Sequence, residues 1–178
     1  MAIDPNDWLI EFSKRLTPDD TVVCDSGSSY YLCHQRLRLP DGCRLITDLA
    51  QGAMGFAIPA AIGAALAKKK GHVYVITGDG SYVFMGHNIY TIADENITNI
   101  TVYVLVNGGY KTILGSQRSW CGGREIGLQK DMVRLRDNKK KAPEETSCRK
   151  KPNSTAGRWL FLRALRCGDY EVRRPVVA

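Results

Sequence analysis

Two apolar segments, each followed directly by a polar turn that contains glycine, constrain the fold of this chain most strongly. Residues 73–77 precede Gly78-Asp79-Gly80-Ser81, and residues 100–106 precede Asn107-Gly108-Gly109. Short apolar runs rich in β-branched residues are typical of buried strands. Asp79 and Asn107 are 28 positions apart, close to the roughly 30 residues of one strand–helix–strand unit. If the strands are parallel neighbours, both polar groups lie at the carboxyl edge of the sheet, where such sheets bind ligands.

The first 128 residues predict alternating helices and strands. We expect helices over about 8–16, 28–39, 56–69 and 85–96, and strands over 21–24, 44–47, 73–77 and 100–106. Asp4 or Asn6 is a candidate N-cap for the first helix. The alternation predicts an α/β fold, a parallel sheet with helices on both faces.

The residue types at the predicted sheet edge indicate a site for a cation and a phosphate. A carboxylate, an amide oxygen and nearby backbone carbonyls are the ligands that a hard cation prefers. Ser81 and the N–H groups at the start of a following helix are suited to phosphate oxygens. The ordinary explanation of Gly-Asp-Gly is a turn, in which glycine permits positive φ and Asp is common. The second turn, after the next strand, favours the ligand site because a divalent ion needs oxygens from separate segments.

Other classes of protein fit the sequence less well. The chain has no P-loop motif, and Val83 leaves Gly-x-Gly-x-x-Gly incomplete, so a nicotinamide site is a weak candidate. No apolar stretch approaches the roughly 18 residues of a membrane helix. The six cysteines form no Cys-x-x-Cys pair, and the first residues lack the pattern of a secretory signal. We therefore expect reduced thiols, no zinc or disulfide scaffold, and a cytoplasmic protein.

Positive charge is concentrated in the last fifty residues. Residues 1–128 contain 11 Lys/Arg and 12 Asp/Glu, a net charge of −1, whereas residues 129–178 contain 14 and 6, a net charge of +8. We place a boundary near residue 128 and expect a basic tail over 129–178, disordered around 137–152. Residues 159–162 with the neighbouring arginines leave open a basic amphipathic helix. A tail that binds nucleic acid is a rival interpretation, although the first 128 residues offer no basic face.

The two turns and their order resemble the thiamine diphosphate-binding motif. Gly78-Asp79-Gly80 is followed by a spacer of 26 residues, which begins with Ser81, and then by Asn107-Gly108-Gly109-Tyr110. Residues 52–63 (GAMGFAIPAAIG) resemble the segment that precedes this motif in acetolactate synthases and related decarboxylases, and Asp25-Ser26-Gly27 resembles the first loop of the same domain. Over about residues 20–127, the chain looks like the C-terminal, diphosphate-binding domain of the acetolactate synthase-like family.

The resemblance implies a cofactor site for thiamine diphosphate and Mg²⁺. The metal ligands would be Asp79, the Asn107 side chain and the Gly109 carbonyl. The cofactor-binding residues would be Gly52, Ala53 and Met54 along the aminopyrimidine ring and Gly78, Gly80 and Ser81 at the diphosphate. Residues 28–31 would approach the thiazolium ring, and Tyr30, Tyr31, Tyr82 and Tyr110 are candidates for lining the cleft.

The resemblance also implies an enzyme, a lyase or transferase that cleaves or joins carbon–carbon bonds of a small 2-oxo acid. In the family, the glutamate that activates the cofactor comes from a separate pyrimidine-binding domain, usually of a neighbouring subunit. This chain would then carry no catalytic residue and would act in a homo- or hetero-oligomer, with Glu11, Glu95 and Glu125 as surface charges.

Three departures from the family pattern are visible. Val106 stands where the family usually has a first asparagine, and the spacer is one residue longer than is common. After about Leu128 the resemblance ends, and the apolar pattern of a last core strand is missing. We therefore expect a sheet incomplete at its C-terminus and hypothesise a truncated or frame-altered tail. A non-catalytic remnant, or a binding module, is the alternative function.

Overall fold

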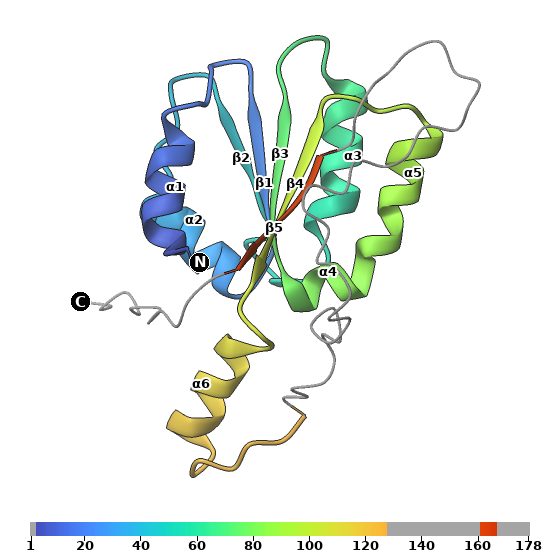
Figure 1. Cartoon of the computed structure of the whole chain (residues 1–178). Coiled ribbons are helices and arrows are strands. Elements are labelled where there is room, and N and C mark those ends of the chain that lie inside the picture. Colours follow the sequence, from blue (N-terminus) through green and yellow to red (C-terminus); the bar gives the residue numbers. More distant parts are fainter. Residues whose placement is uncertain (1–2, 128–160, 167–178) are drawn as a thin grey trace.

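The structure, a computed structural model, describes residues 3–127 and 161–166. Its centre is a five-stranded sheet in which every neighbouring pair is parallel, with the strand order β2-β1-β3-β4-β5 (Figure 1). The strands are β1 (Thr21–Cys24), β2 (Arg44–Ile46), β3 (Val73–Gly78), β4 (Ile100–Val106) and β5 (Phe161–Arg166). The α/β class and the parallel sheet predicted from the sequence are therefore confirmed.

The helices cover both faces of the sheet. They are α1 (Pro5–Ser13), α2 (Ser28–Arg36), α3 (Ala57–Ala67), α4 (Asp79–Met85), the short 3₁₀ helix η1 (Gly86–Asn88), α5 (Ile89–Asp94) and α6 (Lys111–Trp120). Helices α1 and α2 lie on one side and α3 to α5 on the other, while α6 stands apart from the sheet (Figure 1). Asp4 caps α1, since its side chain accepts the backbone N–H of Asn6 at 2.7 Å.

Side chains that alternate along each strand pack into two separate hydrophobic cores, one on each face of the sheet. Val23 and Val75 pack with Ala61 and Ile92 under α3 and α5, whereas their strand neighbours pack under α1 and α2. Those neighbours include Val22 and Ile76, which contact the same cluster as Leu9, Phe12 and Leu32. Because both faces are covered, consecutive strand residues are apolar, which is the pattern read from the sequence.

The position of the cleft follows from the order of the strands. The chain passes from β1 outward to β2, then returns past β1 to β3 and continues to β4. The connection through α2 lies on one face and the connection through α3 on the other (Figure 1). This reversal leaves a crevice at the carboxyl ends of β1 and β3, the usual place for a ligand in an open α/β sheet.

Two expectations about secondary structure are wrong. Residues 161–166, expected to contribute no core strand, form β5, which pairs with β4 from Thr101↔Phe161 to Val106↔Arg166. The helix expected over 85–96 begins earlier, at Asp79, and is divided by η1. An acidic residue in the first turn of a helix is favourable, which helps α4 to start at the turn itself. The remainder of the basic tail, 129–160 and 167–178, lies outside the described residues.

Within the described ranges, no helix is long and apolar enough to cross a membrane. Cys24 and Cys33 are buried, Cys43 is partly exposed and Cys121 is exposed, and all four are free thiols.

Candidate functional site

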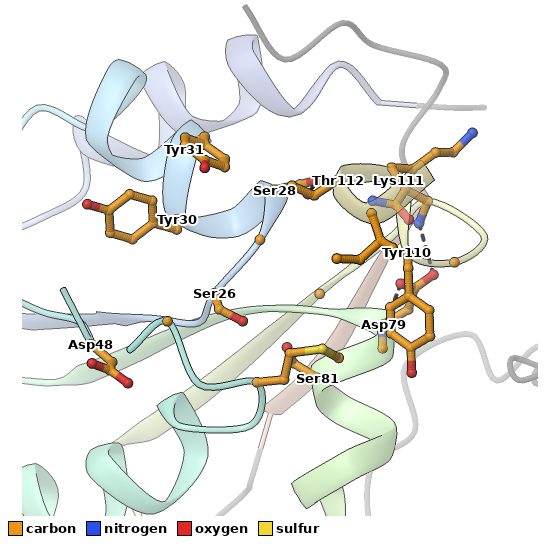
Figure 2. A pocket seen from close by; sticks show the side chains of 18 of the residues that line it. Ser26, Ser28, Tyr30, Tyr31, Asp48, Asp79, Ser81, Tyr110, Lys111 and Thr112 are labelled. Atoms are coloured by element: carbon orange, nitrogen blue, oxygen red, sulfur yellow. Dashed lines mark hydrogen bonds between the residues drawn. The ribbon is translucent and has the colours of Figure 1, made fainter. Parts of the chain in front are cut away.

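A cleft of about 530 Å³ opens at the carboxyl edge of the sheet. Its lining comes from the loop after β1 with the start of α2, from the loop after β2, from the β3–α4 turn, and from the β4–α6 turn with the start of α6. Figure 2 shows Asp79 and Ser81 from the β3–α4 turn on one side of this cleft and Asp48 on another. Four separate segments therefore converge on one space.

Asp79 joins the two turns predicted to form the site. Its side chain is almost fully buried, with 3% of its surface exposed. One carboxylate oxygen, Oδ2, accepts the backbone N–H groups of Asn107 at 3.2 Å and Gly108 at 2.9 Å, and Oδ1 accepts that of Gly80 at 2.9 Å. The register of β3 and β4, which pairs Gly78 with Leu105, places the two turns side by side. The predicted convergence of Asp79 and Asn107 is thus present.

The turn after β4 brings amide and carbonyl oxygens to the same place. The backbone N–H of Asn107 donates to Asp79 at 3.2 Å. The Oδ1 atom of the Asn107 side chain is buried and accepts no hydrogen bond from the described residues. Gly108 and Gly109 have φ of +86° and +133°, so both positions favour glycine. The Gly109 carbonyl accepts the N–H of Lys111 at 2.9 Å, which leaves its second lone pair for another partner.

Neither glycine of the β3–α4 turn is needed for a positive φ. Gly78 has φ of −81°, a conformation open to any residue, and Gly80 is helical. A Cβ on Gly80 would lie 2.5 Å from Cε1 of Tyr110 and 3.3 Å from Cε of Met54. A side chain at position 80 would therefore force Tyr110 or the start of α4 to move.

The loop after β2 forms the wall opposite Asp79. The Asp48 carboxylate organises it by accepting the backbone N–H groups of Ala50, Gln51 and Ala53 at 3.0–3.2 Å. These bonds, that from Gln51 first, lower the pKa of Asp48. Gly52 and Met54 line the cleft, whereas Ala53 is exposed and is not part of the lining.

Aromatic and hydroxyl side chains complete the cleft. Ser28, Tyr30 and Tyr31 line it from the first turn of α2, which lies within the range 28–39 where a helix was expected. The Oγ of Ser28 lies 3.3 Å from Oγ1 of Thr112 at the start of α6. Tyr110 also lines the cleft. Tyr82, the fourth tyrosine considered, packs against the core under α3 and α5 instead, and burial raises its pKa.

The structure thus places eight of the nine predicted site residues in one lining. They are Gly52, Met54, Gly78, Asp79, Gly80, Ser81, Asn107 and Gly109. The sequence interpretation missed Asp48 and the structural role of Asp25. Both acids follow a strand and precede glycine-containing loops, a signal that could have pointed to them.

The charges of the lining indicate which ligands fit. Asp48 and Asp79 contribute two carboxylates, and Lys111 contributes one ammonium group. The described residues contain no group of three or more His, Cys, Asp and Glu that could hold a metal. A metal in this cleft would therefore be bound by carboxylate, amide and carbonyl oxygens, the preference of Mg²⁺ or Ca²⁺.

Comparison with known protein families agrees with this geometry. Residues 25–143 match the family described as "Thiamine pyrophosphate enzyme, C-terminal TPP binding domain", thiamine pyrophosphate being another name for thiamine diphosphate. The chain belongs to this family. The match starts at Asp25 and contains all the residues that line the cleft. It also runs past residue 128, where we expected the resemblance to end, while the domain boundary near 128 remains a prediction.

Curated relatives of this thiamine pyrophosphate-binding domain include plant pyruvate decarboxylases. Pyruvate decarboxylase 1 of Zea mays is 34% identical over 95 residues, which cover 53% of this chain and 15% of the relative. Pyruvate decarboxylase 2 of Oryza sativa subsp. japonica is 31% identical over 97 residues, 54% of this chain and 16% of the relative. Pyruvate decarboxylase 1 of Arabidopsis thaliana is 30% identical over 105 residues, 59% and 17%. The chain therefore spans about a sixth of the length of these relatives.

Proposed function

We propose that this chain provides the Mg²⁺- and thiamine diphosphate-binding part of an enzyme that cleaves or joins a carbon–carbon bond of a 2-oxo acid. The observation that carries the proposal is the buried Asp79 carboxylate, which accepts the N–H groups of Asn107 and Gly108 inside the cleft. This contact places the Asp79 carboxylate beside Asn107, so that the ends of two strands meet in the cleft. The family to which the domain belongs is described by its binding of this cofactor.

The chemistry of the donor set supports a magnesium ion at this point. Asp79, the Asn107 side chain and the Gly109 carbonyl offer three oxygens from two segments, and Mg²⁺ accepts oxygen ligands together with water. The charge of the cleft also favours a cation. The lining contains the carboxylates of Asp48 and Asp79 and the ammonium group of Lys111. A diphosphate group would add negative charge beside the two carboxylates, so it needs a further positive charge to be stable there.

The remaining lining residues would position the organic part of the cofactor. The Ser81 hydroxyl would bind a diphosphate oxygen beside Gly78 and Gly80, and Gly52 and Met54 would contact the aminopyrimidine ring. Ala53, which is outside the lining, would contribute only through its backbone. Bound thiamine diphosphate supplies a thiazolium carbanion and an electron sink for the carbon–carbon bond chemistry.

A partner domain is part of the proposal. Glu11, Glu95 and Glu125 are exposed and lie outside the cleft lining, and Glu125 is paired with Arg118 at 2.7 Å. As the family resemblance implies, the glutamate that activates the cofactor would come from a pyrimidine-binding domain, on this polypeptide or another, in a homo- or hetero-oligomer. We place this assembly in the cytoplasm, as the cysteine pattern predicts.

The names of the relatives support a 2-oxo acid as the substrate class. Pyruvate, named in the relatives' activity, is a 2-oxo acid, so a lyase that decarboxylates such an acid is the leading form of the proposal. The acetolactate synthase-like specificity and transferase activity predicted from the sequence are the second form.

Calorimetric titration of thiamine diphosphate into the full-length chain tests the proposal. Four measurements are needed: wild type with Mg²⁺, wild type with a chelator, Asp79→Asn with Mg²⁺, and Asp94→Asn with Mg²⁺. Asp94 is the matched control because it is an exposed aspartate on α5 that lies outside the cleft lining.

We expect binding to wild type and Asp94→Asn only when Mg²⁺ is present, and a loss of more than about tenfold in affinity for Asp79→Asn because a charged ligand is removed. Equal binding with and without metal would contradict the magnesium site. Equal affinity of the two variants would contradict the role of Asp79.

A further inference from the structure

Asp25 is a buried carboxylate that the proposed cofactor site does not use. It follows β1, only 1% of its surface is exposed, and it lies outside the cleft lining. Its Oδ1 accepts the backbone N–H groups of Ser26 and Gly55, both at 2.9 Å. Its Oδ2 accepts the Thr77 hydroxyl at 3.0 Å and the Ala57 N–H at 3.3 Å. All four donors are uncharged.

The donors come from the segments that form the walls of the cleft. Ser26 begins the wall that leads into α2, and Gly55 directly follows Met54 in the wall after β2. Thr77 is two residues before Asp79 on β3. One side chain thus ties the aminopyrimidine wall of the proposed site to the strand that carries its metal ligand.

The local structure explains why a carboxylate is stable in this place. Ala57 is the first residue of α3, an eleven-residue helix, and the positive end of a helix dipole favours a nearby negative charge. A buried carboxylate that accepts several N–H and O–H donors has its charge compensated without a cation. Removing a donor leaves part of that charge uncompensated, so the tie is sensitive to each partner.

We propose that Asp25 is a positioning residue that fixes the loop 52–55 against the end of β3 and so sets the spacing between the two walls of the cleft. This inference rests on the proposed cofactor site. On the proposed site, thiamine diphosphate would contact residues of both walls, whereas inorganic pyrophosphate with Mg²⁺ would need only the residues of the turns after β3 and β4. Loss of the tie should therefore weaken the first ligand more than the second.

Two variants and one matched control test the proposal in the full-length chain. Asp25→Asn keeps the size of the side chain and removes its charge, and Thr77→Val removes a single hydroxyl that reaches Asp25. Thr101→Val is the control, because Thr101 is also a buried strand threonine with a side-chain hydrogen bond, to His72 at 2.8 Å, at the other end of the sheet. Thr77→Val keeps the test usable if Asp25→Asn does not fold.

The first readout is amide hydrogen exchange at Gly55 and Ala57. We expect about tenfold faster exchange in Asp25→Asn and Thr77→Val than in wild type, with Val75 unchanged, and no difference at Gly55 and Ala57 in Thr101→Val. The second readout is the ratio of the affinities for thiamine diphosphate and for pyrophosphate, each with Mg²⁺. That ratio should fall about tenfold in the two test variants and stay constant in the control.

The outcomes separate this inference from the proposed function. Faster exchange together with a lower affinity ratio supports the positioning role. Unchanged exchange at Gly55 and Ala57, or an equal loss of affinity for both ligands, overturns it. If wild type binds neither ligand, the proposed function fails, and the exchange measurement alone then decides whether Asp25 holds the loop.

Discussion

The ring of Tyr110 lies directly against the backbone of Gly80, so that a Cβ at position 80 would be 2.5 Å from Cε1 of the tyrosine. The two residues come from the turns after β4 and β3 and are 30 positions apart. Both residues line the cleft, and Figure 2 shows the Tyr110 ring beside Asp79. The contact between Tyr110 and Gly80 depends on the absence of a side chain at residue 80.

Gly80→Ala should therefore destabilise the domain, by about 1–3 kcal/mol, because the ring or helix α4 must move to admit a methyl group. Gly63→Ala is the control, since Gly63 lies within α3 and a Cβ there meets nothing within 4 Å. That change should raise stability by about 0.5–1 kcal/mol, the usual gain in a helix. Urea denaturation of both variants gives the comparison, and equal effects would mean that the contact is easily relieved.

Substitutions of the neighbouring residues Asn107 and Val106 should have different effects, the first on metal affinity and the second on stability. Asn107→Ala should lower the affinity for Mg²⁺ in the presence of thiamine diphosphate more than about tenfold, because an oxygen ligand is lost. Val106 packs against the core under α3 and α5, so Val106→Ala should cost about 1–2 kcal/mol of stability and leave the metal affinity unchanged. Metal titration and thermal unfolding measure the two effects. The reverse assignment would show that the register inferred from the sequence is wrong.

His72 should make the stability depend on pH near neutrality. It is half-buried, its Nε2 lies 2.8 Å from the Thr101 hydroxyl, and its backbone N–H donates to Asp20 at 2.8 Å. Burial lowers its pKa below the usual 6.5, and Asp20 partly opposes that change. The unfolded chain therefore binds the proton more readily, so the free energy of unfolding falls as pH drops below 6.5 towards the lowered folded value.

Denaturation midpoints at about pH 7.5 and about pH 5.5 measure this effect. His72→Gln removes the titrating group, so its midpoint should change less between the two conditions than that of wild type. An identical change in both proteins would mean that His72 does not contribute.

Removal of β5 should destabilise the sheet. A chain that ends at residue 127 lacks the strand that pairs with β4 from Thr101 to Val106. The polar groups on that side of β4 then become an exposed edge, which favours association with other chains. We expect a lower denaturation midpoint and more self-association by light scattering than in the full-length chain. An unchanged midpoint would support the hypothesis that the tail is foreign to the domain.

The positions of Asp79 and Asn107 could be predicted because they depend only on the path of the backbone. Once residues 73–77 and 100–106 are parallel neighbours, Asp79 and Asn107 must emerge at the same edge, whatever the details of packing. The apolar runs identify these strands because both faces of the sheet are covered. Asp4 as a helix cap was also predictable, since its partner Asn6 is two residues away.

Other features could not be predicted because their partners are distant in sequence. Asp25 bonds to Gly55, Ala57 and Thr77, which are 30–52 positions away, and no local pattern identifies such partners. Residues 161–166 have neither a continuous apolar run nor an alternating one, and pairing with β4 makes them a strand.

The amino-acid sequence by itself determined the α/β class, the strands that Asp79 and Asn107 follow, and the family to which the domain belongs. These depend on periodicity, turn residues and short spacings, which are local properties of the chain. Only the tertiary structure decided that the ring of Tyr110 lies against Gly80, that Ala53 lies outside the cleft lining, and that Asp25 accepts hydrogen bonds from Gly55, Ala57 and Thr77. Such contacts form between segments far apart in sequence, and they are fixed only when the sheet brings those segments into contact.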